Sequence, residues 1–212
     1  MELAHGTRQV SPSAAEDFIS NMPDDVITNI LDRLRVKDAI RTDAWCRNWR
    51  FKWTLLTKLI FDKKFFAKNN FNVKELSKLL FHLKGPITKF ALFIDYKILD
   101  VEDVNHCVLS LSRKGIKELT INNTLPARLE LAANLYSCME LKQLSLFHVC
   151  FLHSPTFLGF PNLLSLRLSG TLEIKANGSP DNPHTAVTYS LRLDCNTTRL
   201  PQLQNVVLSD IR

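Results

Sequence analysis

The sequence predicts a mixed α+β chain, in which a small N-terminal three-helix module precedes a short, irregular α/β solenoid of repeats. Apolar residues in the first part recur at helical spacing, and a short apolar unit recurs further along at intervals typical of stacked strands. The expected domains are a disordered stretch at 1–16, the helical module at 17–60, a linker with one helix at 61–86, and repeats at 87–212, degenerate from about 172.

The first two helices are predicted from capping residues and an apolar stripe. Ser20 and Asn21 are capping candidates, Pro23 lies near the first turn, and two aspartates follow at the positive helix end. After a break at 35–37, Asp38 can cap a second, short helix that carries an alanine and Ile40. The apolar positions of the first helix are Val26, Ile27, Ile30, Leu31 and Leu34.

A third helix is predicted from the spacing of the three tryptophans. Trp45, Trp49 and Trp53 stand four residues apart, which places them on one face of a helix. This face is either buried in a small core or used to bind a partner. Because so short a segment cannot bury three indoles by itself, the downstream domain or another protein must cover part of them.

The rest of the chain is predicted to form repeats. An amphipathic helix is expected at 73–83, closed by Gly85 and Pro86. A six-residue unit recurs, with apolar residues at its first, fourth and sixth positions. Its copies are Ile87-Phe90-Leu92, Ile116-Leu119-Ile121, Leu141-Leu144-Leu146, Leu163-Leu166-Leu168 and Leu203-Val206-Leu208. The middle residues of successive copies are 29, 25, 22 and 40 residues apart, and the first three of these gaps suit leucine-rich repeats. A weak further copy stands at Thr188-Leu191-Leu193, after a polar run at 176–184 that cannot carry a strand.

Taken together, these residues resemble the plant F-box family with leucine-rich repeats, which often carries a C-terminal FBD domain. The F-box pattern is carried by Asp17 to Val26, by Ile30-Leu31 and Leu34, by Lys37 to Thr42, and by Trp49-Arg50 with Trp53. The segment Leu56–Phe66 resembles the family's link into the repeats, and the resemblance extends to about Leu168. The sequence departs from the family pattern at Asp43, Trp45 and Asn48. We expect a truncated member that lacks the FBD region.

The resemblance implies a substrate-recognition adaptor of an SCF-type E3 ubiquitin ligase, with no catalytic residues of its own. The F-box would bind a Skp-type adaptor, which is held by a cullin, and the repeats would present a target protein. Carried over by position, the adaptor-binding residues are Met22, Pro23, Ile27, Ile30, Leu31, Leu34, Ile40 and Trp49. Outward residues of the repeat strands, expected to bind the target, are Lys117, Glu118, Thr120, Lys142, Gln143, Ser145, Ser165 and Arg167.

Two other functions remain open at this point. Residues 33–68 hold eleven Lys or Arg against three Asp, in a chain of net charge +6. Interleaved with tryptophans, these charges suit a nucleic-acid-binding module. A solvated basic face beside a buried aromatic stripe explains them better, because tryptophans in helical register face away from most of the charges. The other alternative is a repeat scaffold whose F-box has decayed.

Enzymatic and metal chemistry find little support in the sequence. His106 and Cys107 are neighbours, so their side chains point apart and could not easily share a proton. His148, Cys150 and His153 lack the four ligands at zinc-finger spacing. We expect no metal and no cofactor. The sequence has no signal-peptide core and no apolar run of membrane-spanning length, which predicts an intracellular protein of the nucleus or cytoplasm, with reduced cysteines.

Overall fold

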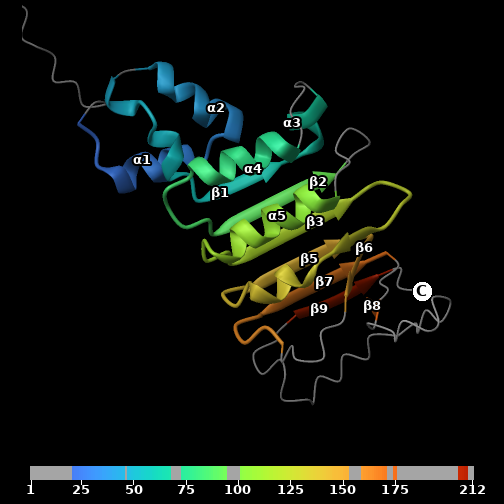
Figure 1. Cartoon of the computed structure of the whole chain (residues 1–212). Coiled ribbons are helices and arrows are strands. Elements are labelled where there is room, and N and C mark those ends of the chain that lie inside the picture. The colour runs from blue at the N-terminus through green and yellow to red at the C-terminus, as the bar shows by residue number, and fades with distance from the viewer. Residues whose placement is uncertain are drawn as a thin grey trace, which may run out of the picture.

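In the computed structural model of the chain, helices pack against a parallel sheet. The structure describes residues 21–45, 47–67, 73–94, 101–152, 159–170, 174–175 and 205–209. A cluster of short helices lies beside strand β1, at one edge of the sheet (Figure 1). The α+β class predicted from the sequence is confirmed. Ser20, the expected disordered stretch at 1–16, the weak repeat at 188–193 and the polar run at 176–184 lie outside the described residues.

Two of the predicted N-terminal helices are present. Helix α1 spans Asp24–Leu31, follows Pro23 at its N-cap, and carries Asp24 and Asp25 in its first turn. Helix α2 spans Val36–Arg41. Its N-cap is Arg35, so Asp38 lies in the first turn and does not cap the helix as predicted.

The predicted third helix is wrong. The described residues 42–45 and 47–55 contain the 3₁₀ segments η1 Thr42–Ala44, η2 Arg47–Trp49 and η3 Lys52–Leu55. Between η2 and η3, Phe51 adopts a left-handed backbone with φ of 63°. Because a 3₁₀ turn holds three residues and a left-handed residue reverses the chain's winding, the four-residue spacing of the tryptophans does not place them on one face.

The main sheet has six parallel strands in the order β1-β2-β3-β5-β7-β9. A second parallel sheet, in the order β4-β6-β8, was not predicted. The strands of the main sheet are β1 Lys58–Phe61, β2 Lys89–Ile94, β3 Glu118–Asn123, β5 Gln143–Phe147, β7 Ser165–Ser169 and β9 Asn205–Ser209. Those of the second are β4 Leu129–Leu131, β6 Val149–Leu152 and β8 Ile174–Lys175.

All five predicted copies of the repeat unit end in a strand of the main sheet, and their middle residues share one register row. Phe90 pairs with Leu119, Leu119 with Leu144, Leu144 with Leu166, and Leu166 with Val206. The 40-residue gap is therefore bridged directly, since β7 pairs with β9. Strand positions and register thus follow the apolar spacing of the sequence.

The sheet begins earlier than residue 87, where the repeats were expected to start. Strand β1 pairs with β2 in the same register, with Leu59 opposite Phe90. Leu56, Leu59 and Phe61 carry the same spacing as the other copies, and all three are fully buried. This segment, predicted to be a link, is a further copy of the unit.

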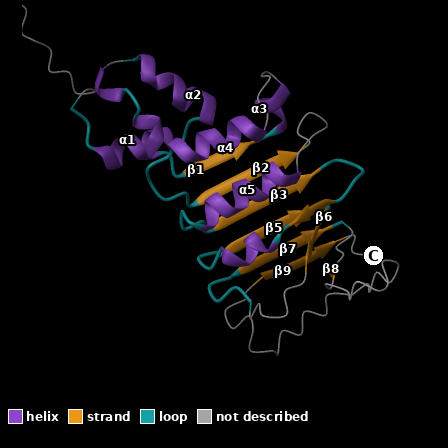
Figure 2. Ribbon diagram, viewed as in Figure 1, coloured by secondary structure: helices purple, strands orange, loops and turns teal. Residues whose placement is uncertain are grey.

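Helices cover one face of the main sheet (Figure 2). They are α3 Lys63–Ala67, α4 Val73–His82, α5 Val101–Ser112 and the 3₁₀ segment η4 Ala133–Ser137. The predicted helix at 73–83 is confirmed as α4. A continuous core of buried side chains runs from Ile27 and Leu31 in α1 to Leu168 in β7, so the helical module and the sheet share one interior.

Three polar side chains are buried in the described part of the chain, those of Thr42, Thr54 and Asn123. Asn123, at the end of β3, is 4% exposed. Its Nδ2 donates to the carbonyls of Ala127 and His148 at 2.8 and 3.0 Å, and its Oδ1 accepts from the N–H of Leu125 at 3.1 Å. Because these bonds satisfy the buried amide, Asn123 can hold the connection from the main sheet toward β4 and β6.

Candidate functional site

Three of the predicted adaptor-binding residues are interior. Ile27, Leu31 and Trp49 are 2%, 0% and 1% exposed and belong to the core. A side chain that is already buried has no surface left to bury against a partner. These three residues therefore stabilise the helical module and are not available on its surface, which corrects their expected position.

The other five predicted residues reach the surface of the helical module. Pro23 is exposed. Met22, Ile30, Leu34 and Ile40 are half-buried and pack against the core. Each therefore anchors the module on one side and leaves some apolar surface on the other.

Three exposed apolar side chains of the module were not among the predicted adaptor-binding residues. Val26, Trp45 and Phe51 are 41%, 60% and 58% exposed. Val26 was placed in the apolar stripe of the first helix, and Trp45 on the tryptophan face. The sequence held one signal for an unusual role of Trp45, because this residue is one of the positions that depart from the family pattern. Contiguous patches of exposed apolar side chains mark interaction sites on soluble proteins, whereas single exposed apolar residues are common.

The tryptophans have three different environments. The ring of Trp49 is buried beneath Trp45, with centroids 5.3 Å apart. The half-buried Trp53 stacks on His82 of α4 at 6.4 Å, with the planes 20° apart. The downstream part of the chain therefore covers Trp53, which is one of the two possibilities drawn from the sequence.

Asp43, another departure from the family pattern, makes an intrachain contact. Its carboxylate accepts a hydrogen bond from the backbone N–H of Phe51, the residue with positive φ. Lys52, the next residue, forms an ion pair with Asp24 at the start of α1. These contacts position the loop that presents Phe51 and connect it to the first helix.

The outward side of the main sheet collects the predicted target-binding residues. Glu118, Gln143 and Ser165 pair across β3, β5 and β7 in one row. A second row joins Thr120, Ser145 and Arg167 in the same way. The two remaining predicted residues, Lys117 and Lys142, are exposed just before β3 and β5. The structure thus brings all eight to one region, while their role in binding stays a prediction.

The same alternation extends this outward side beyond the predicted residues. Strand β2 adds Lys89, whose Nζ lies 2.7 Å from the carboxylate of Glu118. A third row joins Phe93, Asn122, Phe147 and Ser169. The period-two pattern of each strand could have identified these positions, because every second residue of a strand faces the same side.

Base stacking on the tryptophans is not supported by this geometry. A nucleic-acid groove needs several accessible aromatic faces among its cations. Trp49 is buried, and Trp53 is stacked on His82. Trp45 alone among the three is exposed.

The buried thiols of Cys107 and Cys138 are kept in their neutral form. Burial raises the pKa of the Cys107 thiol to about 11, and the pKa of Cys138 to about 12. His106 is exposed while Cys107 is buried, so the two side chains point apart as expected. Within the described ranges, no three His, Cys, Asp or Glu side chains are grouped closely enough to hold a metal ion.

No helix among the described residues has the length and apolar character needed to cross a membrane.

Comparisons with known proteins point to one family. The chain is 38% identical over 159 residues to an F-box/FBD/LRR-repeat protein of Arabidopsis thaliana, a match that covers 72% of this chain and 38% of the relative. An FBD-associated F-box protein and an F-box protein of the same plant are each 29% identical over 164 residues. Each of these two matches covers 75% of this chain, and they cover 40% and 52% of the relatives.

The chain thus spans about two fifths to one half of the length of these relatives. No family model matches the sequence, and no solved structure matches the fold. The chain belongs to the family of plant F-box/LRR-repeat proteins.

Proposed function

We propose that this chain is the substrate-recognition adaptor of an SCF-type E3 ubiquitin ligase. Its helical module docks on a Skp-type adaptor and, through it, on a cullin. The main sheet is a short leucine-rich-repeat solenoid whose outward rows bind a target protein for ubiquitination. The observation that carries the proposal is the division of the surface: apolar side chains are exposed on the module, whereas polar rows face outward on the sheet.

The adaptor-binding surface combines predicted and newly found residues. Fully burying one aliphatic side chain contributes about 1.5–3 kcal/mol, so a few anchors can hold a standard interface. The predicted anchors that reach the surface are Met22, Pro23, Ile30, Leu34 and Ile40. The structure adds Val26, Trp45 and Phe51.

The target-binding surface is the outward side of strands β2, β3, β5 and β7 of the main sheet. Its rows mix charged, amide and hydroxyl side chains with the half-buried rings of Phe93 and Phe147. Such a surface suits a protein partner, because apolar contacts provide affinity and polar pairs provide specificity. Ubiquitin transfer belongs to the other subunits of the ligase, which act in the nucleus and cytoplasm, where we place this chain.

Co-purification with a Skp-type adaptor tests the module. We expect the wild-type chain to capture the adaptor, and Ile30→Asp or Leu34→Asp to abolish capture, because a carboxylate would be buried at the interface. Arg167→Asp is the matched control, since it adds a carboxylate on the outward side of β7 and leaves the module unchanged. It should keep the adaptor and lose the target.

Both module residues also touch the core, so melting temperatures of the variants must be measured alongside. If an unfolded variant prevents a decision, Phe51→Asp provides a change at a more exposed position. If the wild-type chain and a folded Ile30→Asp variant capture the adaptor equally poorly, the chain is a repeat scaffold whose F-box no longer binds.

A further inference from the structure

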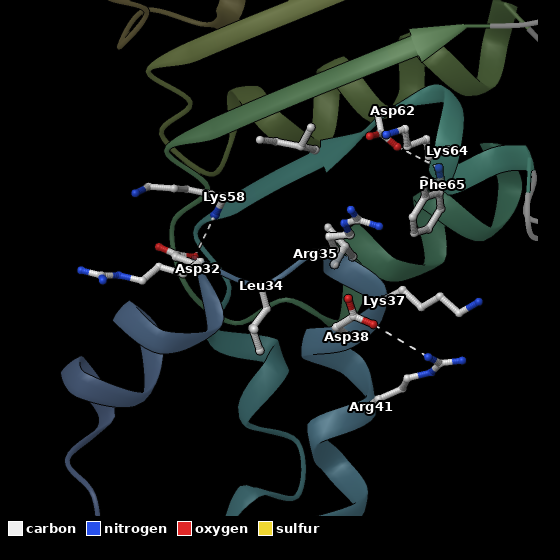
Figure 3. A pocket seen from close by; sticks show the side chains of 13 residues that line it. Asp32, Leu34, Arg35, Lys37, Asp38, Arg41, Lys58, Asp62, Lys64 and Phe65 are labelled. Carbon is white, nitrogen blue, oxygen red and sulfur yellow. Dashed lines mark hydrogen bonds and ion pairs between the residues drawn. The ribbon is translucent and has the colours of Figure 1, made fainter.

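A groove of about 360 Å³ lies where the helical module meets the edge of the main sheet (Figure 3). Its walls come from the α1–α2 connection, from α2, from β1 and from the start of α3. Of the eight predicted adaptor-binding residues, only Leu34 lines it. The groove is therefore largely separate from the adaptor-binding surface and from the outward rows of β2, β3, β5 and β7.

The groove has an apolar base. Leu34 and Phe65 are half-buried, and Ile60 of β1 is 48% exposed. The ring of Phe65 packs edge-on against Phe61 and Phe66, with centroids 5.0 and 5.3 Å away. This packing fixes one wall of the groove and leaves Ile60 as its most accessible apolar side chain.

The rim of the groove has excess positive charge. Six cations and three carboxylates line it, a balance of +3. Asp32 accepts from the N–H of Thr57 at 2.9 Å and from that of Lys58 at 3.2 Å. Asp38 lies 3.8 Å from Arg41, and Asp62 accepts from the N–H of Phe65 at 2.8 Å. The cations are Arg33, Arg35, Lys37, Arg41, Lys58 and Lys64.

All three carboxylates thus bind groups of this chain. The side chain of Arg35 lies between α2 and β1 in the close view (Figure 3). In the described part of the chain, no carboxylate lies within 4.0 Å of the charged groups of Arg35, Lys58 or Lys64. An anionic ligand would find these cations without displacing an existing ion pair.

Strand β1 brings its backbone to the same groove. It is the terminal strand of the main sheet, so the described strands pair with it on one side only. The carbonyl of Thr57 accepts from the N–H groups of Thr88 and Lys89, so the backbone N–H and C=O groups of residues 59 and 61 also face β2. The backbone of Lys58 and Ile60 therefore faces the opposite edge, where Asp32 already accepts from Lys58.

We propose that this groove binds an extended, acidic peptide segment of a partner protein. The segment lies along the edge of β1, with carboxylates at the basic rim and one apolar side chain against Ile60 and Leu34. An extended peptide can add backbone hydrogen bonds to an open sheet edge, and charge complementarity supplies specificity. A nucleic acid fits less well, because Phe65 is the aromatic residue of the groove and its ring is packed against Phe61 and Phe66.

The test uses the full chain and a fluorescein-labelled peptide that alternates glutamate and valine over seven residues, followed by fluorescence anisotropy. We expect saturable binding, weaker by at least about tenfold when glutamine replaces every glutamate. The variant Arg35→Glu/Lys58→Glu should weaken binding of the acidic peptide by at least about tenfold. The matched control Lys84→Glu/Arg113→Glu makes the same change of charge at exposed positions outside the groove and outside both proposed binding surfaces, and should bind like the wild type.

Four outcomes would overturn the proposal. They are an absence of saturable binding, an equal loss in both double variants, tighter binding of a labelled oligothymidylate than of the peptide, and a groove variant that loses Skp-type adaptor capture but keeps the peptide. Melting curves of the double variants serve as the folding check. If Arg35→Glu/Lys58→Glu does not fold, Lys64→Glu decides in its place, because Lys64 is exposed at the start of α3.

Discussion

The helical module and the main sheet divide their apolar residues in opposite ways. In the sheet, alternate residues such as Leu119 and Ile121 are buried, and the residues between them face outward with polar or charged groups. The module buries Trp49 completely and leaves Trp45 and Phe51 more than half exposed. The sheet thus buries its apolar residues by stacking one repeat on the next, whereas the module retains exposed apolar surface that a second protein can cover.

The largest expected effect tests whether Trp49 belongs to the interior. Trp49→Ala should lower the free energy of unfolding by about 3–5 kcal/mol, because the truncation leaves a cavity in the module. Trp45→Ala should lower it by less than about 1 kcal/mol, since that side chain is 60% exposed. Urea unfolding of both variants measures the difference, and equal losses would contradict the division of the two rings.

The next effect concerns the polar interior of the sheet region. Asn123→Ala should lower the free energy of unfolding by about 1–3 kcal/mol, because two carbonyls and one N–H lose their partner. Asn122→Ala, on the outward side of the same strand, is the control. Thermal unfolding and hydrogen exchange at the Leu125 amide measure the effect. Unchanged protection of that amide would show that Asn123 does not hold the connection.

A smaller effect tests the loop that replaces the predicted third helix. Asp43→Ala should destabilise the chain by about 1 kcal/mol, because the Phe51 N–H loses its acceptor. Phe51→Gly should offset part of this loss in the double variant, since glycine adopts a positive φ without a steric cost. Melting temperatures of the single and double variants give the comparison. A stabilising Asp43→Ala change would indicate that the left-handed turn does not depend on Asp43.

The smallest effect is a dependence of stability on alkaline pH. Burial raises the pKa of Cys107 from 9.0 to about 11. This raised pKa contributes stability that is complete below pH 9 and is lost as the pH rises toward 11, because the unfolded chain releases the thiol proton first. Cys107→Ala should show a shallower fall of the melting temperature across this range. The same slope in both proteins would mean that the thiol is ionised as readily in the folded chain as in the unfolded one.

The sequence predicted the sheet better than the module for a physical reason. A strand with one buried face needs only an alternation of apolar and other residues. A shift of one residue in the pairing would move every side chain of the strand to the other face, so the apolar row also determines the register. The spacing of Leu119, Leu144 and Leu166 therefore determined both strand position and pairing. The same rule would have placed Leu59 in a further copy, although that segment was interpreted as a link. Helix α5 and the strands of the second sheet did not follow from this repeat spacing.

The candidate sites were predicted in part. The outward residues from Lys117 to Arg167 followed from alternation, and the structure extends them to Lys89 and Phe93 in β2. The surface of the module could not be obtained in this way. Ile27 and Leu31 were expected to face a partner, but the single interior shared by module and sheet buries them. Apolar residues on the same stripe of a helix can therefore be either buried in this interior or exposed on the surface of the module.

The sequence by itself determined the α+β class, the bounds of α4 to within one residue, the strands of the repeat units and their order. These features depend on the regular spacing of apolar residues along the chain, which can be read from neighbouring residues alone. The tertiary structure alone decided which tryptophan is buried, where the edge of the sheet lies and how the groove between α2 and β1 is formed. These features depend on contacts between segments far apart in the chain, such as Trp53 with His82 and Asp32 with Thr57, and no local spacing encodes them.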